Sequence, residues 1–208
     1  MVDNPVRGRF NAWLLDALDG YMHRKYGLLK SRLLGSVPNT VVELGPGAGA
    51  NMRYLPPGTR LIAFEPNVRM HSRLRSRAER FRLNLDLRTS GAEALDIPDR
   101  SVDLVCVTLV LCSVSDPARV LSEVRRVLQP GGRFVCIEHV PAQQGSGLRR
   151  LQHVVASPWQ WVFEGCNLLN QTEALIASAG FQNIEVQRLG IPTAFFPIRS
   201  QISAVCTV

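Results

Sequence analysis

The chain has 208 residues, of which 46% are hydrophobic and 20% are charged. This composition excludes a disordered or fibrous protein and fits one well-buried domain with short additions. No apolar run reaches the roughly 20 residues that span a bilayer, and no signal segment is visible. We therefore expect a cytoplasmic protein.

The formal net charge of +7 indicates an acidic partner only if the basic residues gather in one place.

The first 38 residues carry apolar side chains at helical spacing, which predicts two helices parted near Gly20. Gly35 and Pro38 end the second helix. We treat residues 1–38 as an N-terminal helical cap that precedes a domain over residues 39–208. Two roles are open for these helices: a lid over a ligand site, or an amphipathic surface for peripheral contact with a membrane or a partner.

From residue 39 onward, strand and helix patterns alternate, which is typical of a parallel sheet covered on both faces. The last two apolar runs are joined by a short link, which favours an antiparallel pair. We predict an α/β, Rossmann-like, mostly parallel seven-stranded sheet with an antiparallel last strand and helices on both faces. The first expected strand begins at about residue 40. The other expected strands cover residues 61–65, 83–88, 102–111, 133–140, 181–189 and 200–208, and the expected helices between them cover residues 67–82, 117–128 and 171–180.

The segment 141–170 interrupts this alternation and is rich in Gln, Gly and aromatic residues. We interpret it as a substrate-side insertion. Trp159, Trp161 and Phe163 are spaced to place alternate side chains on one face, where they line an apolar acceptor site or form the core of the insertion. Glu164 and Asn167 lie in the same segment and are weaker acceptor-contact candidates.

Basic residues gather in the expected helix 67–82, where Arg69, Arg73, Arg77 and Arg80 share one face. This face is either solvated or binds an anionic surface or ligand. The (D/N)PP(Y/F/W) signature of enzymes that act on nucleic-acid bases is absent after the fourth strand, where TLVLCS stands. We therefore expect no nucleic-acid partner.

The cysteines form no CxxC pair and show no histidine spacing suited to zinc, so we expect reduced thiols and no metal site. Cys112 follows the fourth strand, but a thiol beside a reactive ligand is at risk of modification, and a packing role is favoured. The five cysteines are Cys106, Cys112, Cys136, Cys166 and Cys206.

A glycine-rich turn, VVELGPGAGAN, follows the first strand over residues 41–51. Glycine permits positive φ and the close approach of a ligand. The spacing of Gly45, Gly47 and Gly49 differs from the GxGxxG pattern of dinucleotide sites. Glu43, before the turn, would repel a pyrophosphate, and Glu65, at the end of the second strand, could accept ribose hydroxyls. They favour a ligand with an ammonium group and ribose hydroxyls.

Four successive motifs, ELGPGAG, FEP, SGAEALDIPDRSVDLV and EVRRVLQPGGRFVCIEH, resemble those of class I S-adenosylmethionine-dependent methyltransferases. The resemblance covers residues 39–208 and implies S-adenosylmethionine as the cofactor. Many such families carry Asp rather than Glu at the end of the second strand, a change that keeps the carboxylate. The residues that match cofactor-binding positions are Glu43, Gly45, Gly47, Gly49, Glu65, Pro66, Gly91, Ala92, Glu93, Thr108 and Leu109.

Within this class, TLVLCSVSDPARVLSEVRRVLQPGG, EHV and EGCNL resemble the methyltransferase-like thiol methyltransferases of the endoplasmic reticulum and their bacterial relatives. Animal members carry an apolar N-terminal anchor, which we do not expect here. The resemblance implies a small apolar acceptor, with a thiol favoured. Two alternatives stay open: N- or O-methylation of a lipid head group or a quinone-like ring, and a non-catalytic S-adenosylmethionine-binding module.

Two polar residues, Glu138 and His139, end the fifth strand, where a base can reach an acceptor. We name both as candidate catalytic residues. The alternative for His139 is a hydrogen bond to a neighbouring loop. The sequence does not indicate the oligomeric state.

Overall fold

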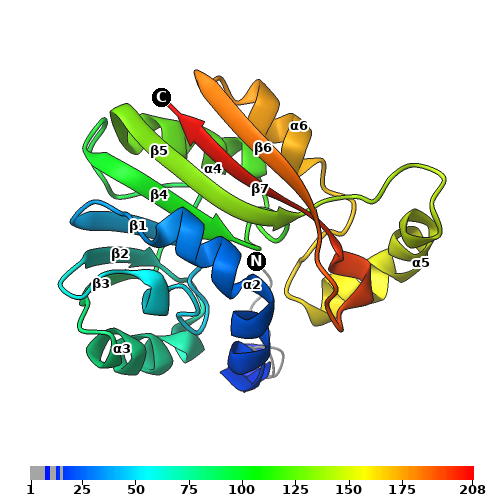
Figure 1. Ribbon diagram of the computed structural model, residues 1–208, viewed down its shortest axis with the longest axis horizontal. Helices are drawn as coiled ribbons and strands as arrows, with labels where there is room; N and C mark the ends of the chain where they lie inside the picture. Colours follow the sequence, from blue (N-terminus) through cyan, green and yellow to red (C-terminus); the bar gives the residue numbers. More distant parts are fainter. Residues whose placement is uncertain (1–7, 10–12, 15) are drawn as a thin grey trace.

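The computed structural model describes residues 8–9, 13–14 and 16–208 and contains one seven-stranded sheet in the order β3-β2-β1-β4-β5-β7-β6 (Figure 1). Strands β1 to β5 pair in parallel, whereas β7 is antiparallel to both β5 and β6. The predicted Rossmann-like sheet is therefore confirmed. Its strands are β1 Thr40–Leu44, β2 Arg60–Phe64, β3 Asn84–Arg88, β4 Val102–Thr108, β5 Leu128–His139, β6 Asn183–Gly190 and β7 Ser200–Thr207.

Helices cover both faces of the sheet, as predicted. One core layer joins Leu34 and Leu74, from the second and third helices, to Val41 of β1. The other joins Val124 to Val42, the next residue of β1, because successive strand side chains point to opposite faces. The helices are α2 Asp19–Leu34, α3 His71–Arg80, α4 Pro117–Val127, α5 Gly147–Val162 and α6 Thr172–Ser178, with short 3-10 turns η1 Met52–Tyr54, η2 Val68–Met70 and η3 Phe196–Ile198.

Helix α4 shows how local sequence determines an element. Asp116 caps its first turn by accepting a hydrogen bond from the backbone N–H of Arg119 at 2.9 Å, and Pro117 follows. The helix ends at Val127, close to the end expected from the pattern. The Pro-Gly-Gly segment at 130–132 lies within β5, which pairs with β4 at Leu128 and again from Arg133 onward, with a shift of register between these two points.

The N-terminal cap is anchored by part of the arginine face. Residues 16–17 are helical, the chain turns at Leu18, and α2 begins at Asp19, next to the expected break. Arg77 of α3 contacts Asp16 at 3.0 Å and Asp19 at 2.9 Å, and Arg73 lies 3.5 Å from Asp16. These two arginines are therefore engaged in ion pairs with the cap. Most of the first expected helix lies outside the described residues.

The insertion contains a helix that was not predicted. Helix α5 lies beyond the carboxyl ends of β4 and β5 (Figure 1). Because the segment is helical, the alternating arrangement expected for its aromatic residues is wrong. Trp159 and Phe163, one turn apart, have ring centroids 4.2 Å apart, whereas Trp161 is 65% exposed. Gln152 is the only fully buried residue of α5, but apolar residues recur at helical spacing along it and are half-buried: Leu148, Leu151, Val155, Trp159 and Val162. The sequence therefore carried a helical pattern here that the prediction did not use.

Candidate active site

The glycine-rich turn lies at the carboxyl end of β1, and all three of its glycines have positive φ. The values are +60° for Gly45, +56° for Gly47 and +84° for Gly49. A Cβ at Gly45 would lie 2.6 Å from Cγ2 of Val110, in the loop after β4. Glycine is therefore required at position 45 both by the backbone conformation and by the close approach of a second loop.

Glu43 presents an unpartnered carboxylate oxygen beside this turn. Its Oε1 accepts a hydrogen bond from Nδ2 of Asn51 at 2.7 Å, and the same Nδ2 lies 3.0 Å from Oγ1 of Thr108. Within the described part of the chain, the buried Oε2 of Glu43 has no hydrogen-bond partner. Burial raises the pKa of Glu43 to about 7. Such an oxygen fits a ligand that carries an ammonium group.

Asn51 was not among the predicted site residues. It ends the glycine-rich segment and joins Glu43 of β1 to Thr108 of β4 through one amide group. The signal that could have identified it is its polar character at the end of an otherwise small and apolar turn. Its Oδ1 is also buried without a partner in the described residues.

Glu65, immediately after β2, is held by two backbone amides. Oε2 accepts from the N–H of Gly47 and Oε1 from the N–H of Asn67, both at 2.9 Å. Burial raises the pKa of this carboxyl group. A carboxylate offers about four acceptor sites, so Glu65 can still accept ribose hydroxyls. Pro66, next to it, is exposed on the turn.

The predicted adenine-side residues follow β3. Ala92 is buried, with 7% of its surface exposed. Oε1 of Glu93 accepts hydrogen bonds from Ser115, from its hydroxyl at 2.8 Å and from its backbone N–H at 3.2 Å. A Cβ at Gly91 would lie 2.8 Å from Oε2 of Glu93, so the carboxylate folds back over the glycine. Contact of these residues with adenine stays a prediction.

The loop after β4 begins with a strained residue. Leu109 has φ +57°, a conformation that costs a non-glycine residue roughly 1–2 kcal/mol. Its N–H donates to the carbonyl of Ile137 at 2.8 Å. The turn directs the next two amides, of Val110 and Leu111, toward Glu138, whose Oε1 accepts both at 2.8 and 3.0 Å.

Glu138 is thus a positioning residue for the loop that packs against Gly45. It is fully buried, and burial raises its pKa to about 7. Its second oxygen, Oε2, has no partner among the described residues. A direct catalytic role for Glu138 stays a prediction.

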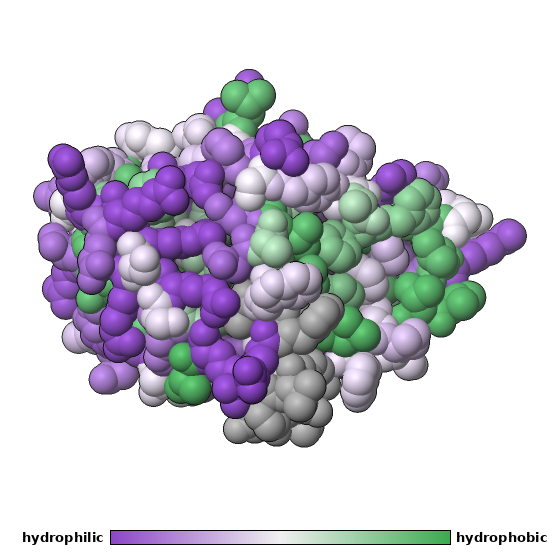
Figure 2. Space-filling model, turned by 90° about the horizontal axis from the view of Figure 1, so that it is seen from below, coloured by the Kyte–Doolittle hydropathy of each residue, from purple (hydrophilic) through white to green (hydrophobic). Residues whose placement is uncertain are grey.

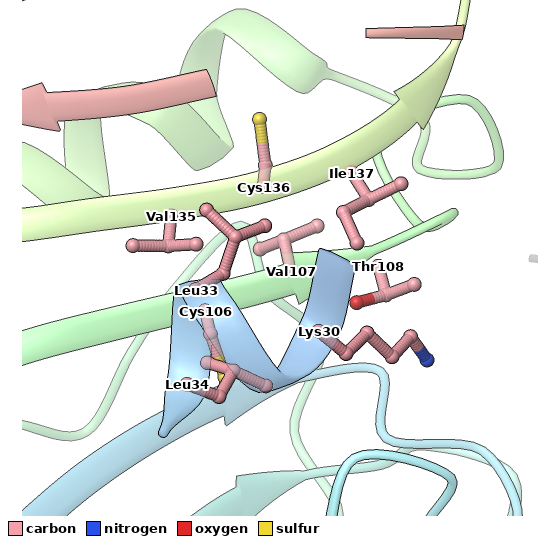
Figure 3. Close-up of a pocket in the computed structure, with 9 residues that line it drawn as sticks. All are labelled: Lys30, Leu33, Leu34, Cys106, Val107, Thr108, Val135, Cys136 and Ile137. Atoms are coloured by element: carbon pink, nitrogen blue, oxygen red, sulfur yellow. The ribbon is translucent and has the colours of Figure 1, made fainter. Parts of the chain in front are cut away.

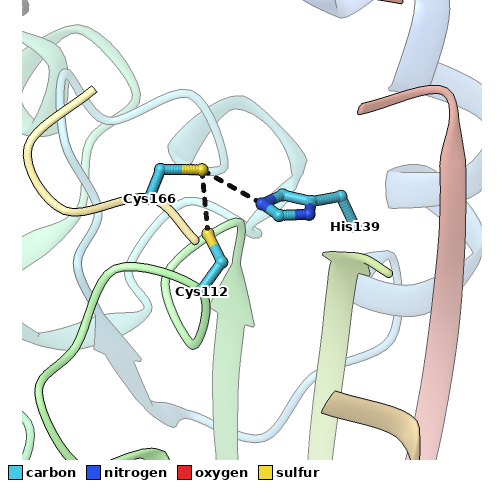
Figure 4. Close-up of side chains that lie close together, drawn as sticks. All are labelled: Cys112, His139 and Cys166. Carbon is cyan, nitrogen blue, oxygen red and sulfur yellow. Dashed lines mark hydrogen bonds between the residues drawn. The ribbon is translucent and has the colours of Figure 1, made fainter. Parts of the chain in front are cut away.

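His139 points toward two cysteines that lie far away in the sequence (Figure 4). Its Nε2 lies 3.1 Å from Sγ of Cys166, which lies 3.6 Å from Sγ of Cys112. The indole N–H of Trp159 donates to the Cys166 sulfur at 3.2 Å. Hydrogen bonds with Cys112, His139 and Trp159 lower the pKa of Cys166 to about 5.

This group of residues, the Cys112–His139–Cys166 cluster, was not visible in the sequence. Cys112 is buried, as a packing residue would be, but its sulfur faces another sulfur. Three side chains of metal-ligating type therefore lie together although their spacing in the sequence does not indicate a site. The expectation of no metal site stays a prediction. The hydrogen-bonding alternative for His139 is confirmed, and its role as a base stays a prediction.

The N-terminal cap contributes a buried lysine. Lys30 of α2 lines a small pocket against β4 and β5, close to Thr108 (Figure 3). Burial lowers the pKa of Lys30 to about 8, and the charge of Glu43 opposes that shift. Sequence reasoning did not single out Lys30, because one lysine in a helix is normally a surface residue.

The cap also contacts both sides of the site. Nδ2 of Asn67, beside Glu65, lies 3.5 Å from the carbonyl oxygen of Gly8. A Cβ at Gly8 would lie 3.5 Å from Oε1 of Glu164 in the insertion. Tyr21 of α2 accepts a hydrogen bond from the N–H of Ala194 at 2.6 Å. The described part of the cap therefore lies beside both Glu65 and the insertion, and its role as a lid stays a prediction.

The fold, the glycine-rich turn and the acids that end β1 and β2 define an S-adenosylmethionine-dependent methyltransferase. Residues 42–136 match the family model described as a methyltransferase domain. The chain belongs to the thiol S-methyltransferase family. It is 36% identical to human thiol S-methyltransferase TMT1A over 166 residues, 78% of this chain and 68% of that protein. It is 37% identical to human TMT1B over 209 residues, 95% of this chain and 86% of that protein.

A solved structure shows the same fold. It is a protein from Thermotoga maritima described as a SAM-dependent methyltransferase, possible histamine N-methyltransferase, with a TM-score of 0.68 and 22% sequence identity. The match covers 96% of this chain and 97% of that one. Within the described part of this chain, no helix has the length and apolar character needed to cross a membrane.

Proposed function

We propose that the protein transfers a methyl group to the sulfur of a small apolar thiol. The observation that carries this proposal is the similarity to human thiol S-methyltransferase TMT1B along 95% of the chain. The aromatic rings near the carboxyl ends of β4 and β5 support a small apolar acceptor. Phe195 lies edge-on to Trp159 and Phe163, with centroid distances of 6.2 and 5.8 Å.

The residues present fit S-adenosylmethionine, which when bound supplies an electrophilic methyl group on a sulfonium. The unpartnered Oε2 of Glu43 would take the ammonium group, and the buried cation of Lys30 would take the carboxylate. Glu65 would hold the ribose hydroxyls while its own position is fixed by Gly47 and Asn67. By the family resemblance, adenine would lie beside Ala92 and Glu93, and Thr108 and Leu109 would face the sulfonium.

On the acceptor side, the chain orients the thiol and excludes water. Methyl transfer is an in-line displacement, so fixed orientation supplies much of the rate enhancement. Glu138 fixes the loop after β4, and His139 would orient the acceptor sulfur or accept its proton. A thiol ionises near neutral pH, so a strong base is unnecessary.

Methyl transfer from radiolabelled S-adenosylmethionine to thiophenol, phenol and aniline, which differ only in the acceptor atom, tests this proposal. We expect transfer to thiophenol alone. Transfer to the phenol, the aniline, a hydroquinone or phosphatidylethanolamine would favour the O- or N-methylation alternative. Tight binding of S-adenosylmethionine with no transfer to any acceptor would favour a non-catalytic module.

We further propose a cytoplasmic location with peripheral contact to a membrane surface. Figure 2 shows hydrophobic side chains gathered on the half that carries α5 and hydrophilic ones on the half that carries α3. Val154 and Trp161 of α5 and Phe196 of η3 are 79%, 65% and 44% exposed. The guanidinium of Arg199 lies 4.2 Å from the centroid of the Phe196 ring, which supports contact with anionic lipid head groups.

Co-sedimentation with phosphatidylcholine vesicles, with and without phosphatidylserine, tests this contact. Trp161→Ser and Phe196→Ser should reduce binding. Val186→Ser is the matched control, because Val186 is 36% exposed on β6, away from this surface. Equal binding by all variants would contradict the proposal.

A further inference from the structure

The Cys112–His139–Cys166 cluster brings together three metal-ligating side chains from separate parts of the fold. Cys112 belongs to the loop after β4, His139 ends β5, and Cys166 lies in the insertion. Their ligand atoms, two sulfurs and one ring nitrogen, all lie within 4.8 Å of one another, and all three residues are buried.

The distances in this cluster suit a tetrahedral ion. Zinc binds sulfur at about 2.3 Å and imidazole nitrogen at about 2.0–2.1 Å, which places two sulfur ligands about 3.8 Å apart and a sulfur and a nitrogen about 3.6 Å apart. The cluster has Cys112 and Cys166 sulfurs 3.6 Å apart, and Cys166 Sγ lies 3.1 Å from His139 Nε2. These two distances are therefore within about half an ångström of tetrahedral values, and the third, between Cys112 Sγ and the imidazole, lies within 4.8 Å.

The surroundings support a metal-bound sulfur. The indole N–H of Trp159 donates to Cys166 at 3.2 Å, and hydrogen bonds of this kind orient ligands and stabilise a thiolate. Two thiolates and an imidazole prefer zinc over magnesium or calcium, which take oxygen ligands. Three protein ligands leave the fourth position open, as in catalytic rather than structural zinc sites.

We propose that Cys112, His139 and Cys166 bind a Zn²⁺ ion whose fourth coordination position takes the acceptor thiol. This inference rests on the proposed thiol acceptor. When the thiol binds, a zinc–sulfur bond forms, the S–H bond breaks and the proton leaves to solvent. The acceptor sulfur then forms its bond to the methyl carbon as the bond from that carbon to the sulfonium breaks. The thioether product is neutral and leaves the metal more easily than the thiolate.

The first experiment measures the metal content of the full chain, purified without a histidine tag or chelator and incubated with Zn²⁺ before removal of free metal. We expect about one zinc ion per chain. Cys112→Ala and Cys166→Ala should each lose most of the zinc. Cys206→Ala is the matched control, because Cys206 is also buried but lies on β7, outside the cluster. It should keep its zinc.

Replacement of zinc by Co²⁺ tests the open position directly. A cobalt–thiolate absorption band should appear in the unmodified protein and shift when thiophenol is added, whereas phenol should leave it unchanged. Absence of bound zinc and of the cobalt band in the unmodified protein would overturn the proposal, and this result does not depend on whether the variants fold.

The outcomes separate this inference from the proposed function. Thiol methylation by a protein that binds no zinc would overturn the metal site and leave the thiol acceptor intact. Bound zinc whose cobalt spectrum is insensitive to thiophenol would overturn the role of the fourth position. Calorimetry should show unchanged S-adenosylmethionine affinity in Cys112→Ala and Cys166→Ala, and a loss of affinity in both would indicate collapse of the site instead.

Discussion

The two halves of the site are built in different ways. On the expected cofactor side, two of the hydrogen bonds that hold the acids are local: Glu65 bonds Asn67, two positions away, and Glu43 bonds Asn51, eight away. Two others are longer, from Gly47 to Glu65, 18 positions apart, and from Asn51 to Thr108, 57 apart. On the acceptor side, His139 and Cys166 are 27 positions apart, and Cys112 and Cys166 are 54 apart. The residues predicted to hold the cofactor therefore lie in short sequence motifs, whereas the residues predicted to face the acceptor come together only after the chain has folded. The two halves should respond separately to mutation.

The largest effect is expected at Gly45, where the halves meet. Gly45→Ala should lower the free energy of unfolding by about 2–4 kcal/mol, since it combines left-handed strain with a contact of 2.6 Å to Val110. Gly58→Ala is the matched control, because Gly58 has φ +88° but no heavy atom within 4 Å of its added Cβ. It should cost only about 1–2 kcal/mol. Equal costs in urea unfolding would show that the approach of Val110 is unimportant.

The next effect belongs to the cofactor half. Glu65→Ala should weaken binding of S-adenosylmethionine by about 1–3 kcal/mol, or roughly 5- to 150-fold, because it leaves the amides of Gly47 and Asn67 unpaired and removes the ribose acceptor. Calorimetry measures this change. Glu65→Gln keeps one acceptor oxygen and should lose less. The KM for the acceptor should stay the same in both variants, and unchanged cofactor affinity would refute the role of Glu65.

The reverse pattern is expected in the acceptor half. Trp159→Phe keeps an aromatic ring but removes the hydrogen bond to Cys166, so the KM for thiophenol should rise about fivefold, the effect of roughly 1 kcal/mol. Steady-state kinetics measure it. Trp161→Phe, on the exposed side of α5, serves as the control and should change KM little. A change in cofactor affinity for Trp159→Phe would mean that the halves are coupled.

A change of pH is expected to have a smaller effect on the affinity for S-adenosylmethionine. With the pKa of Glu43 raised to about 7 by burial, only the carboxylate formed above that pH pairs with an ammonium group, so cofactor affinity should rise several-fold between about pH 6 and 7.5. Lys30 and Glu65 are the charged groups that face Glu43. Glu43→Gln should bind more weakly and give a flat profile by calorimetry. An unchanged profile in this variant would assign the pH dependence to another group.

The same raised pKa has a consequence for stability. The folded protein holds the Glu43 proton more tightly than the unfolded chain does, because the pKa is about 7 in one state and near 4.5 in the other. The contribution of this group to stability is therefore fully present below about pH 4.5 and is lost as the pH rises to about 7. In Glu43→Gln this part of the pH dependence of unfolding should disappear.

The smallest effect on stability is expected at Arg77 of α3, which anchors the N-terminal cap. Arg77→Ala removes the ion pairs with Asp16 and Asp19, which are partly exposed, so the free energy of unfolding should fall by about 1 kcal/mol or less. The difference should shrink in high salt. Arg75→Ala, on the exposed side of α3, is the control. A large rise in KM for Arg77→Ala would show that the cap also shapes the acceptor site.

Much of the fold could be predicted from the sequence, because each element has a local cause. The β-branched run of β1 and the Asp-Pro start of α4 are examples, and both lie where the pattern placed them. Helix α5 was missed although it carries apolar residues at helical spacing, because Pro158 and the Gly and Gln residues around it are typical of irregular structure. The arginine face could not be assigned fully either, since the partners of Arg77 lie 58 and 61 positions away.

The sequence by itself determined the sheet, the glycine-rich turn and the acids beside that turn, because strand periodicity, positive φ and the spacing of Glu43 and Glu65 act over short stretches of chain. Only the tertiary structure decided which distant side chains meet. Lys30 became a buried cation beside Glu43 when α2 packed on the sheet, and Cys112, His139 and Cys166 became neighbours when the insertion packed over β4 and β5. Contacts of this kind leave no periodic signal, because they depend on how whole elements pack rather than on neighbouring residues.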